Sequence, residues 1–188
     1  RLLDHNVGRF IEMARASGYY DNTIFVLFGD HNGRISTLPF MAPAFELLGL
    51  ESTHVHAMIH APKLIQPRFV DEAASLVDLM PTVAGMLGLE YGTATMGRDL
   101  QLPAPEGERA VPVILREGAF PVIGAVTRKH LVRMNADGSK ASMHDLAAEA
   151  PLKDVSASHP EEFARLSKLA RGLHESARFM MYDNVVGK

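Results

Sequence analysis

A short apolar strand that ends at an aspartate and a histidine constrains this chain more than any other feature. The run TIFVLF, residues 23–28, is apolar, β-branched or aromatic, and Gly29 stops it directly before Asp30 and His31. A run of this length between turn-forming residues predicts a strand buried on both faces, as in a parallel sheet. Ligands bind beyond the carboxyl ends of such strands, so Asp30 and His31 are predicted to face a binding site.

Asp30 and His31 combine two kinds of metal ligand. A carboxylate oxygen beside an imidazole nitrogen suits half of a site for a divalent transition metal. The alternative is that Asp30 caps the next element and His31 faces solvent, because an Asp-His dipeptide is common. Composition alone favours this alternative, whereas the position directly after a buried strand favours the metal.

The first half of the chain has the element order of an α/β fold. Strands are predicted at 23–28 and 55–60, and helices at 2–17, 39–48 and 79–87, the last capped by Asp78. Helix and strand alternate through this part, which favours a mostly parallel sheet flanked by helices. We therefore predict an α/β core over residues 1–102.

The second half changes character after a Pro-rich connector at 103–108. Short strands are predicted at 111–115, 122–127, 130–134 and 140–144. The segment Ser158-His159-Pro160-Glu161 has the pattern of a capping box and predicts the start of a last helix. Residues 103–188 are thus predicted to form a small antiparallel subdomain with a terminal helix.

Three histidines form a second cluster of candidate ligands. In a strand, His54, His56 and His60 would share one face, so their imidazoles could project together toward a second metal or a phosphate. The alternative, which we favour, is a packed His60 and a loop His54. Arg34 and Ser36 could bind an anionic headgroup, although a solvated Arg34 is the stronger interpretation.

Composition excludes some functions. A net charge of −3 argues against a nucleic-acid partner, which requires a clustered basic surface. The absence of cysteine excludes disulfides and thiolate ligands but fixes no compartment. Arg1 opens directly into a periodic helical segment, which predicts that the chain is the carboxyl part of a longer protein.

Several ordered motifs resemble the alkaline phosphatase superfamily, in its sulfatase-like branch. They are LLDHNVGRFIEMARASGYYDN followed by TIFVLFGDHNG, then LVDLMPTVAGMLGL, MGRDL and MHDLAAEAPLKDVSASHPEEFARLSKL. Gly-Asp-His-x-Gly is closer to the lipoteichoic acid synthase and phosphoglycerol transferase group than to arylsulfatases. Asn32 departs from the pattern, since many members have Gly or an aromatic residue there.

The resemblance implies metal-assisted cleavage or transfer of a sulfate or phosphate ester, including phosphoglycerol esters. Asp30 and His31 would be ligands of one divalent cation, Mn or Zn in preference to Ca or Mg, and His56 would contact the substrate. The nucleophile would lie upstream, in the remainder of the parent polypeptide, so the fragment alone would be inactive. Residues 1–102 would be the carboxyl half of the sulfatase-like core.

The same resemblance implies a parent protein on the periplasmic or extracellular face of the membrane, acting on an envelope lipid or glycan. Two other functions stay open. One is a non-catalytic binding or scaffold module with this fold. The other is a two-metal phosphodiesterase or phosphomutase, in which His56 or His60 would bind the second ion.

Overall fold

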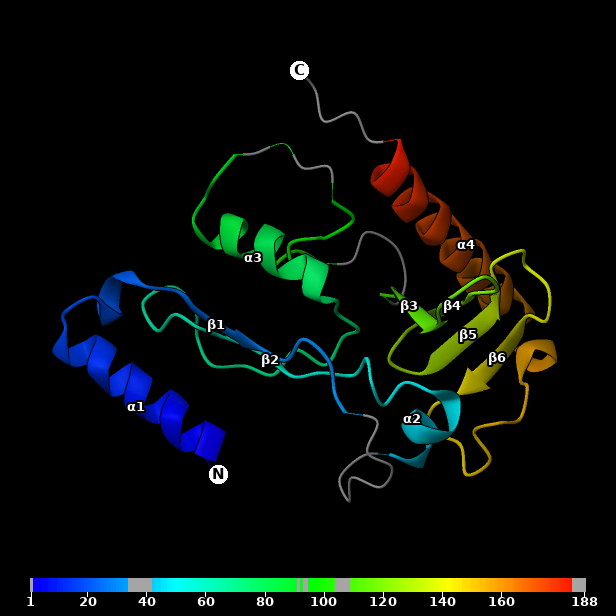
Figure 1. Cartoon of the computed structure of the whole chain (residues 1–188), viewed down its shortest axis with the longest axis horizontal. Coiled ribbons are helices and arrows are strands. Elements are labelled where there is room, and N and C mark those ends of the chain that lie inside the picture. The colour runs from blue at the N-terminus through cyan, green and yellow to red at the C-terminus, as the bar shows by residue number, and fades with distance from the viewer. Residues whose placement is uncertain (1, 34–41, 91, 93–94, 104–108, 184–188) are drawn as a thin grey trace. The chain divides into compact units, whose positions relative to one another are not determined.

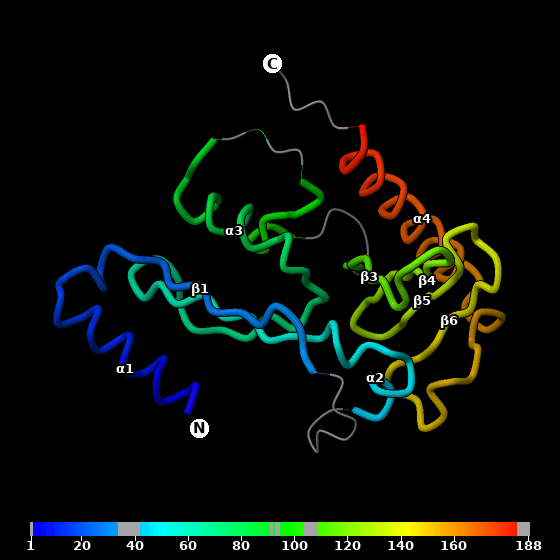
Figure 2. Tube along the Cα trace, viewed as in Figure 1, coloured from blue at the N-terminus to red at the C-terminus, as the bar shows by residue number. Residues whose placement is uncertain are grey.

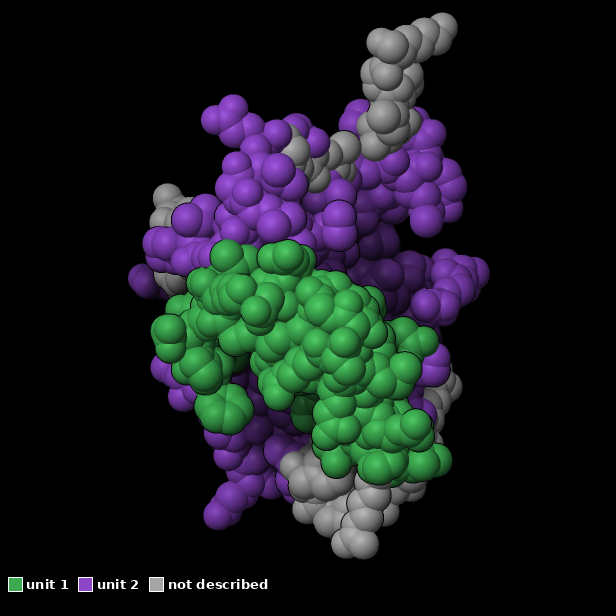
Figure 3. All heavy atoms as spheres, turned by 90° about the vertical axis from the view of Figure 1, so that its left-hand side faces the viewer, with its two compact units in different colours: residues 1–30, 56–70 green, residues 31–55, 71–188 purple. Residues whose placement is uncertain are grey.

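The computed structural model of the protein describes residues 2–33, 42–90, 92, 95–103 and 109–183 (Figure 1). The chain divides into two compact units, residues 1–30 with 56–70 and residues 31–55 with 71–188, which Figure 3 shows in separate colours. The predicted division between residues 102 and 103 is a different one and stays a prediction. No helix of the described chain is long and apolar enough to cross a membrane.

The first unit contains one long helix and a two-stranded sheet. Helix α1 (Leu2–Ala16) and a 3-10 turn (Tyr20–Asn22) precede β1 (Phe25–Phe28), which pairs with β2 (Ala57–His60). The pairing is antiparallel, with Phe25 opposite His60 and Phe28 opposite Ala57. The two strands run side by side in Figure 2.

The predicted mostly parallel sheet is wrong, because both sheets in the described residues are antiparallel. Alternation of helices and strands gives the order of elements along the chain. It does not give the relative direction of two paired strands, which was inferred from that order. The chain leaves β1 at Phe28 and re-enters β2 at Ala57, at the same end of the pair. The segment between them is therefore a return connection and not the crossover that a parallel pair requires.

Strand β1 is also less buried than the sequence indicated. Phe25 is only 6% exposed, but Phe28 at the other end is 55% exposed. Burial of this strand on both faces is therefore wrong for the described residues. Apolar side chains allow a strand to be buried on both faces, but burial also requires neighbouring elements on both faces. This two-stranded sheet does not provide them.

The second unit is built on a four-stranded antiparallel sheet. The strands are β3 (Val111–Arg116), β4 (Val122–Val126), β5 (His130–Asn135) and β6 (Ser142–Asp145), in that spatial order. A long helix, α4 (Pro160–Tyr182), follows a 3-10 turn (Ser156–Ser158) and lies against the sheet (Figure 1). The predicted antiparallel carboxyl-terminal sheet and terminal helix are thus confirmed.

This sheet is buried on both faces, and strand alternation divides the core in two. Val132 and Met134 of β5 pack in one cluster with Leu166 of α4. Leu131, which points to the opposite face, packs in a second cluster with Leu48 and Leu50. Leu48 ends the short helix α2 (Pro43–Leu48), so this early segment contributes to the core of the second unit.

Two predicted helix caps are not formed. Helix α4 begins after His159, which makes no side-chain cap, so Ser158 lies outside the helix. Helix α3 (Leu79–Met86) likewise receives no cap from the Asp78 side chain. That carboxylate instead accepts hydrogen bonds from the backbone N–H groups of Ser75 and Arg98, both at 2.8 Å.

Candidate functional site

The end of the β1–β2 pair places Asp30 and His56 together in the first unit. The Gly29 N–H donates to the His56 carbonyl over 3.0 Å, so the antiparallel register continues one residue beyond each strand. Asp30 follows Gly29, and His56 precedes β2. Both side chains therefore come from the same end of the strand pair, where the chain leaves β1 and returns to β2.

His31 begins the second unit and is held by its neighbour. Its Nδ1 lies 3.4 Å from the carbonyl oxygen of Asn32. The Asn32 backbone N–H donates to the Ser52 carbonyl over 3.0 Å, and its side-chain Nδ2 donates to the His54 carbonyl. Asp30 and His31 are consecutive, so their Cα atoms lie about 3.8 Å apart.

The three histidines of the second cluster do not converge. His56 directly precedes β2 and His60 ends it, so the two are four residues and roughly 13 Å apart at the rise of a strand. His60 Nε2 lies 2.6 Å from the Tyr20 hydroxyl, and its ring packs near Phe25. The ring of His54 stacks on Phe45, with centroids 4.6 Å apart.

The partners of Tyr20 explain why His60 is a packing residue. The Arg15 guanidinium donates to the Tyr20 hydroxyl over 2.9 Å and lies over its ring. That contact raises the pKa of Arg15, chiefly through the hydrogen bond. His60 thus completes a chain of three side chains that joins α1 to the far end of β2, away from Asp30.

The donor set fits part of a metal site. Asp30 offers carboxylate oxygens, and a ring nitrogen hydrogen-bonded to a carbonyl, as in His31, is usual for a ligating imidazole. Within the described residues, however, no group of three or more His, Asp or Glu side chains is arranged to hold a metal ion. Arg34 and Ser36 lie in the segment 34–41, outside the described residues.

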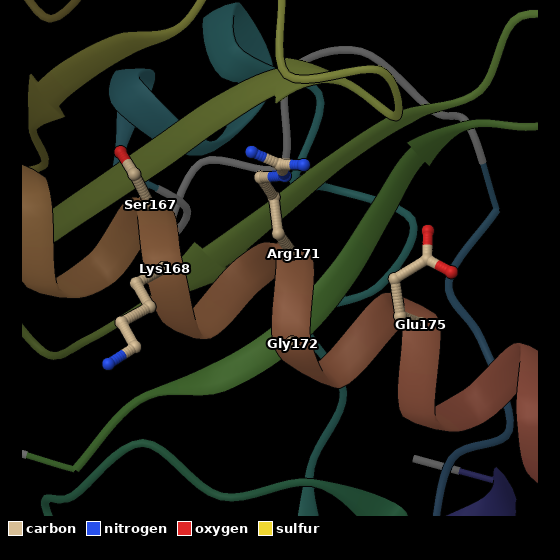
Figure 4. Close-up of a pocket in the computed structure, with 5 residues that line it drawn as sticks. All are labelled: Ser167, Lys168, Arg171, Gly172 and Glu175. Atoms are coloured by element: carbon tan, nitrogen blue, oxygen red, sulfur yellow. The ribbon is translucent and has the colours of Figure 1, made fainter.

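A hollow of about 410 Å³ lies along α4 (Figure 4). Its lining comes from one helix face: Ser167, Lys168, Arg171, Gly172 and Glu175. Arg171 reaches from α4 to the turn after β5, where its guanidinium packs over Gly138. The hollow contains none of the residues that the sequence singled out.

Comparison with protein families identifies the class of protein to which the first 89 residues belong. Residues 1–89 match the family named Sulfatase. The matched residues 1–89 belong to this sulfatase family, within the alkaline phosphatase superfamily.

The chain is also similar to a curated relative and to two solved structures. The chain is 33% identical over 132 residues to the lipoteichoic acid synthase-like YvgJ of Bacillus subtilis (strain 168), covering 64% of this chain and 20% of that protein. It superposes on the lipoteichoic acid synthase LtaP of Listeria monocytogenes with a TM-score of 0.65 and 19% identity, over 95% of this chain and 43% of the other.

The second structure is BT4656 in complex with its substrate D-glucosamine-2-N,6-O-disulfate. The TM-score is 0.62 at 18% identity, over 97% of this chain and 39% of the other. At such identities the two superpositions concern the fold alone. The chain spans about a fifth of the curated relative, and about two fifths of each solved chain.

Two features of this region escaped the sequence analysis. The hydrogen bonds of Asn32 join residues about 20 positions apart, and the contact of Tyr20 with His60 spans 40 positions. Neither pair follows a local spacing. The only available signal was that Asn32 follows the Asp-His pair directly, where an amide side chain offers both a donor and an acceptor.

Proposed function

We propose that the chain supplies the carboxyl-terminal part of a metal-dependent enzyme that cleaves or transfers a sulfate or phosphate ester. The observation that carries the proposal is the Asp30-His31 pair at the end of β1, in a chain of the sulfatase family. Asp30 and His31 would hold one divalent cation, Mn or Zn in preference to Ca or Mg, because imidazole nitrogen suits these transition metals better.

In this proposal the residues of the chain bind and orient while the nucleophile comes from elsewhere in the protein. A bound cation would supply positive charge that stabilises the developing oxyanion and activates the nucleophile. Asp30 and His31 would hold this cation. His56, at the same strand end as Asp30, would donate a hydrogen bond to a non-bridging oxygen of the ester, and Arg34 would add a positive charge for an anionic group.

Phosphoglycerol-type esters are the substrate class that we favour. Support comes from the relative YvgJ, named as lipoteichoic acid synthase-like, and from the fold shared with LtaP. Sulfated sugars are the alternative, because BT4656 shares the fold and binds a disulfated glucosamine. Either substrate would place the complete protein at the outer face of the cell membrane, acting on an envelope lipid or glycan.

Metal content and esterase activity of the complete protein test the proposal. We expect Asp30→Ala and His31→Ala each to lose most of the bound Mn or Zn, and the hydrolysis of nitrophenyl phosphate or sulfate with it. The 188-residue chain alone should show no turnover, because it would lack the nucleophile. Two tightly bound ions per chain would instead indicate a two-metal enzyme, and no metal at all a scaffold module.

The chain offers a matched control. The tripeptide Asp-His-Asn at 30–32 also occurs at residues 4–6, on the exposed face of α1. Asp4→Ala and His5→Ala should therefore leave both metal content and activity unchanged. If the variants at 30 and 31 behave like these controls, the proposed ligands are wrong.

A further inference from the structure

We propose that Asn32 is a positioning residue that sets the ring of His31 for metal binding. The inference rests on the proposed function, because it takes His31 as a ligand. It adds the residue that orients this ligand and the hydrogen bonds that hold that residue in place.

The ring of His31 is placed by a carbonyl group. A carbonyl oxygen can only accept a hydrogen bond, so the contact of Nδ1 with the Asn32 oxygen, at 3.4 Å, requires the proton to be on Nδ1. In the neutral imidazole, the lone pair is then on Nε2, which becomes the metal-donor atom. A hydrogen bond of this kind is what usually fixes the tautomer and rotation of a ligating histidine.

The carbonyl of Asn32 is itself held at two points. The backbone N–H of Asn32 donates to Ser52, and its side-chain Nδ2 donates to His54. Both acceptors are backbone carbonyls of the segment that leads into β2. The two bonds restrain the rotation of residue 32 about its backbone, and with it the direction in which its carbonyl points toward His31.

The segment that receives these bonds is fixed in turn. The N–H groups of Thr53 and His54 both donate to the Leu50 carbonyl, over 3.1 and 3.0 Å. Leu50 is 2% exposed and packs in the cluster that contains Leu131 of β5. The ring of His54 stacks on Phe45, which packs against the same cluster.

The side-chain bond to His54 explains why residue 32 is asparagine. Its amide is short and has an N–H donor for a backbone carbonyl, which neither alanine nor leucine offers. Leucine has nearly the shape of asparagine, so Asn32→Leu removes the donor with little change in volume. The backbone bond to Ser52 would remain in both variants, which confines the change to the side chain.

The test measures the tautomer of His31 and the metal affinity together. Full-length protein labelled with ¹⁵N-histidine gives the ring-nitrogen shifts near pH 8, where imidazole is neutral, and His31→Gln assigns the His31 signals. Titration with Zn²⁺ gives the affinity. We expect Asn32→Ala and Asn32→Leu to mix the two tautomers and to weaken Zn²⁺ binding about 10- to 100-fold, as for other residues that orient a ligand.

Asn6→Ala, in the repeated tripeptide on α1, is the matched control and should change neither measurement. The inference is overturned if the variants at 32 keep both the tautomer and the affinity of the wild type. It is also overturned if the affinity falls while the tautomer stays, since general loosening would then be the cause. A wild-type protein without His31-dependent Zn²⁺ binding would instead refute the proposed function, and this inference with it.

Discussion

Asp78 and Arg109 form an ion pair with almost no access to solvent. The carboxylate of Asp78 lies 2.9 Å from the Arg109 guanidinium, and the two residues are 2% and 5% exposed. Burial lowers the pKa of Arg109, and the charge of Asp78 acts against that shift. Among the described residues, neither Nε nor Nη2 of Arg109 has a hydrogen-bond partner, and the charge of Asp78 is the largest compensation for the burial of Arg109.

Removal of the Arg109 guanidinium should therefore destabilise the folded protein. We expect Arg109→Leu to lower the free energy of unfolding by about 3–5 kcal/mol, because Asp78 would remain as an uncompensated buried charge. Urea unfolding measures the change. The exposed pair of Arg128 with Asp71, at 3.1 Å, provides the control, and Arg128→Leu should cost less than about 1 kcal/mol. Equal effects of the two substitutions would contradict the assigned role of burial.

Single residues were predictable where the signal was local. Asp30 and His31 follow β1 after Gly29, so a strand prediction was enough to place them at its end, while their role as ligands stays a prediction. The partners of Arg109 and His60 were not predictable, since each lies at least 30 positions away along the chain. Arg109 follows a charged, Pro-rich connector, a composition that suggests solvent and gives no sign of its burial.

Elements were predicted well in position and poorly in direction. The apolar periodicity placed α1 and α3 within one residue of their observed ends, because burial of one face depends on the sequence of that helix alone. The direction of β2 relative to β1 depends on how residues 29–56 connect them. Periodicity carries no information on that connection, so the parallel pairing was an error.

The first turn of α4 contains a charged residue, Glu162, whose effect on the stability of the helix can be tested. Two hydrogen bonds from Arg165, each 2.7 Å long, lower the pKa of Glu162. The negative charge also lies at the positive end of the helix dipole. The pKa of Glu162 is lower in the folded state than in the unfolded state. This stabilisation is therefore fully present at pH values above the unfolded-state pKa, and it is lost as the pH falls through the folded-state pKa.

We therefore expect Glu162→Gln to destabilise the protein by up to about 1 kcal/mol at neutral pH. The difference from wild type should begin to close as the pH falls below the unfolded-state pKa of about 4.3, and should vanish once the pH is below the lowered folded-state pKa of Glu162. Thermal unfolding between neutral and acidic pH measures both curves. Glu161→Gln, one residue earlier and without an ion pair in the described structure, controls for the dipole. A gap that persists at low pH would contradict the electrostatic explanation.

At the scale of the whole molecule, the two units differ in how much core they contain. The second has two hydrophobic clusters, one on each face of its four-stranded sheet. In the described part of the first, the buried apolar residues are only Ala14, Phe25 and Ala61. Large apolar side chains such as Phe28, Met58 and Phe69 are at least half exposed there. A two-stranded sheet with so little burial is marginal by itself.

Amide hydrogen exchange of the 188-residue chain should reveal this difference. Amide exchange from a strand requires the strand to open locally. The free energy of this opening rises with the apolar area that the strand buries. We expect the amides of β1 and β2 to exchange at least roughly 10-fold faster than those of β4 and β5, which is 1.4 kcal/mol or more in opening free energy. Strand β3, at the edge of the larger sheet, gives an internal comparison and should exchange at an intermediate rate. Equal protection of β1 and β4 would mean that the first unit has support beyond its described contacts.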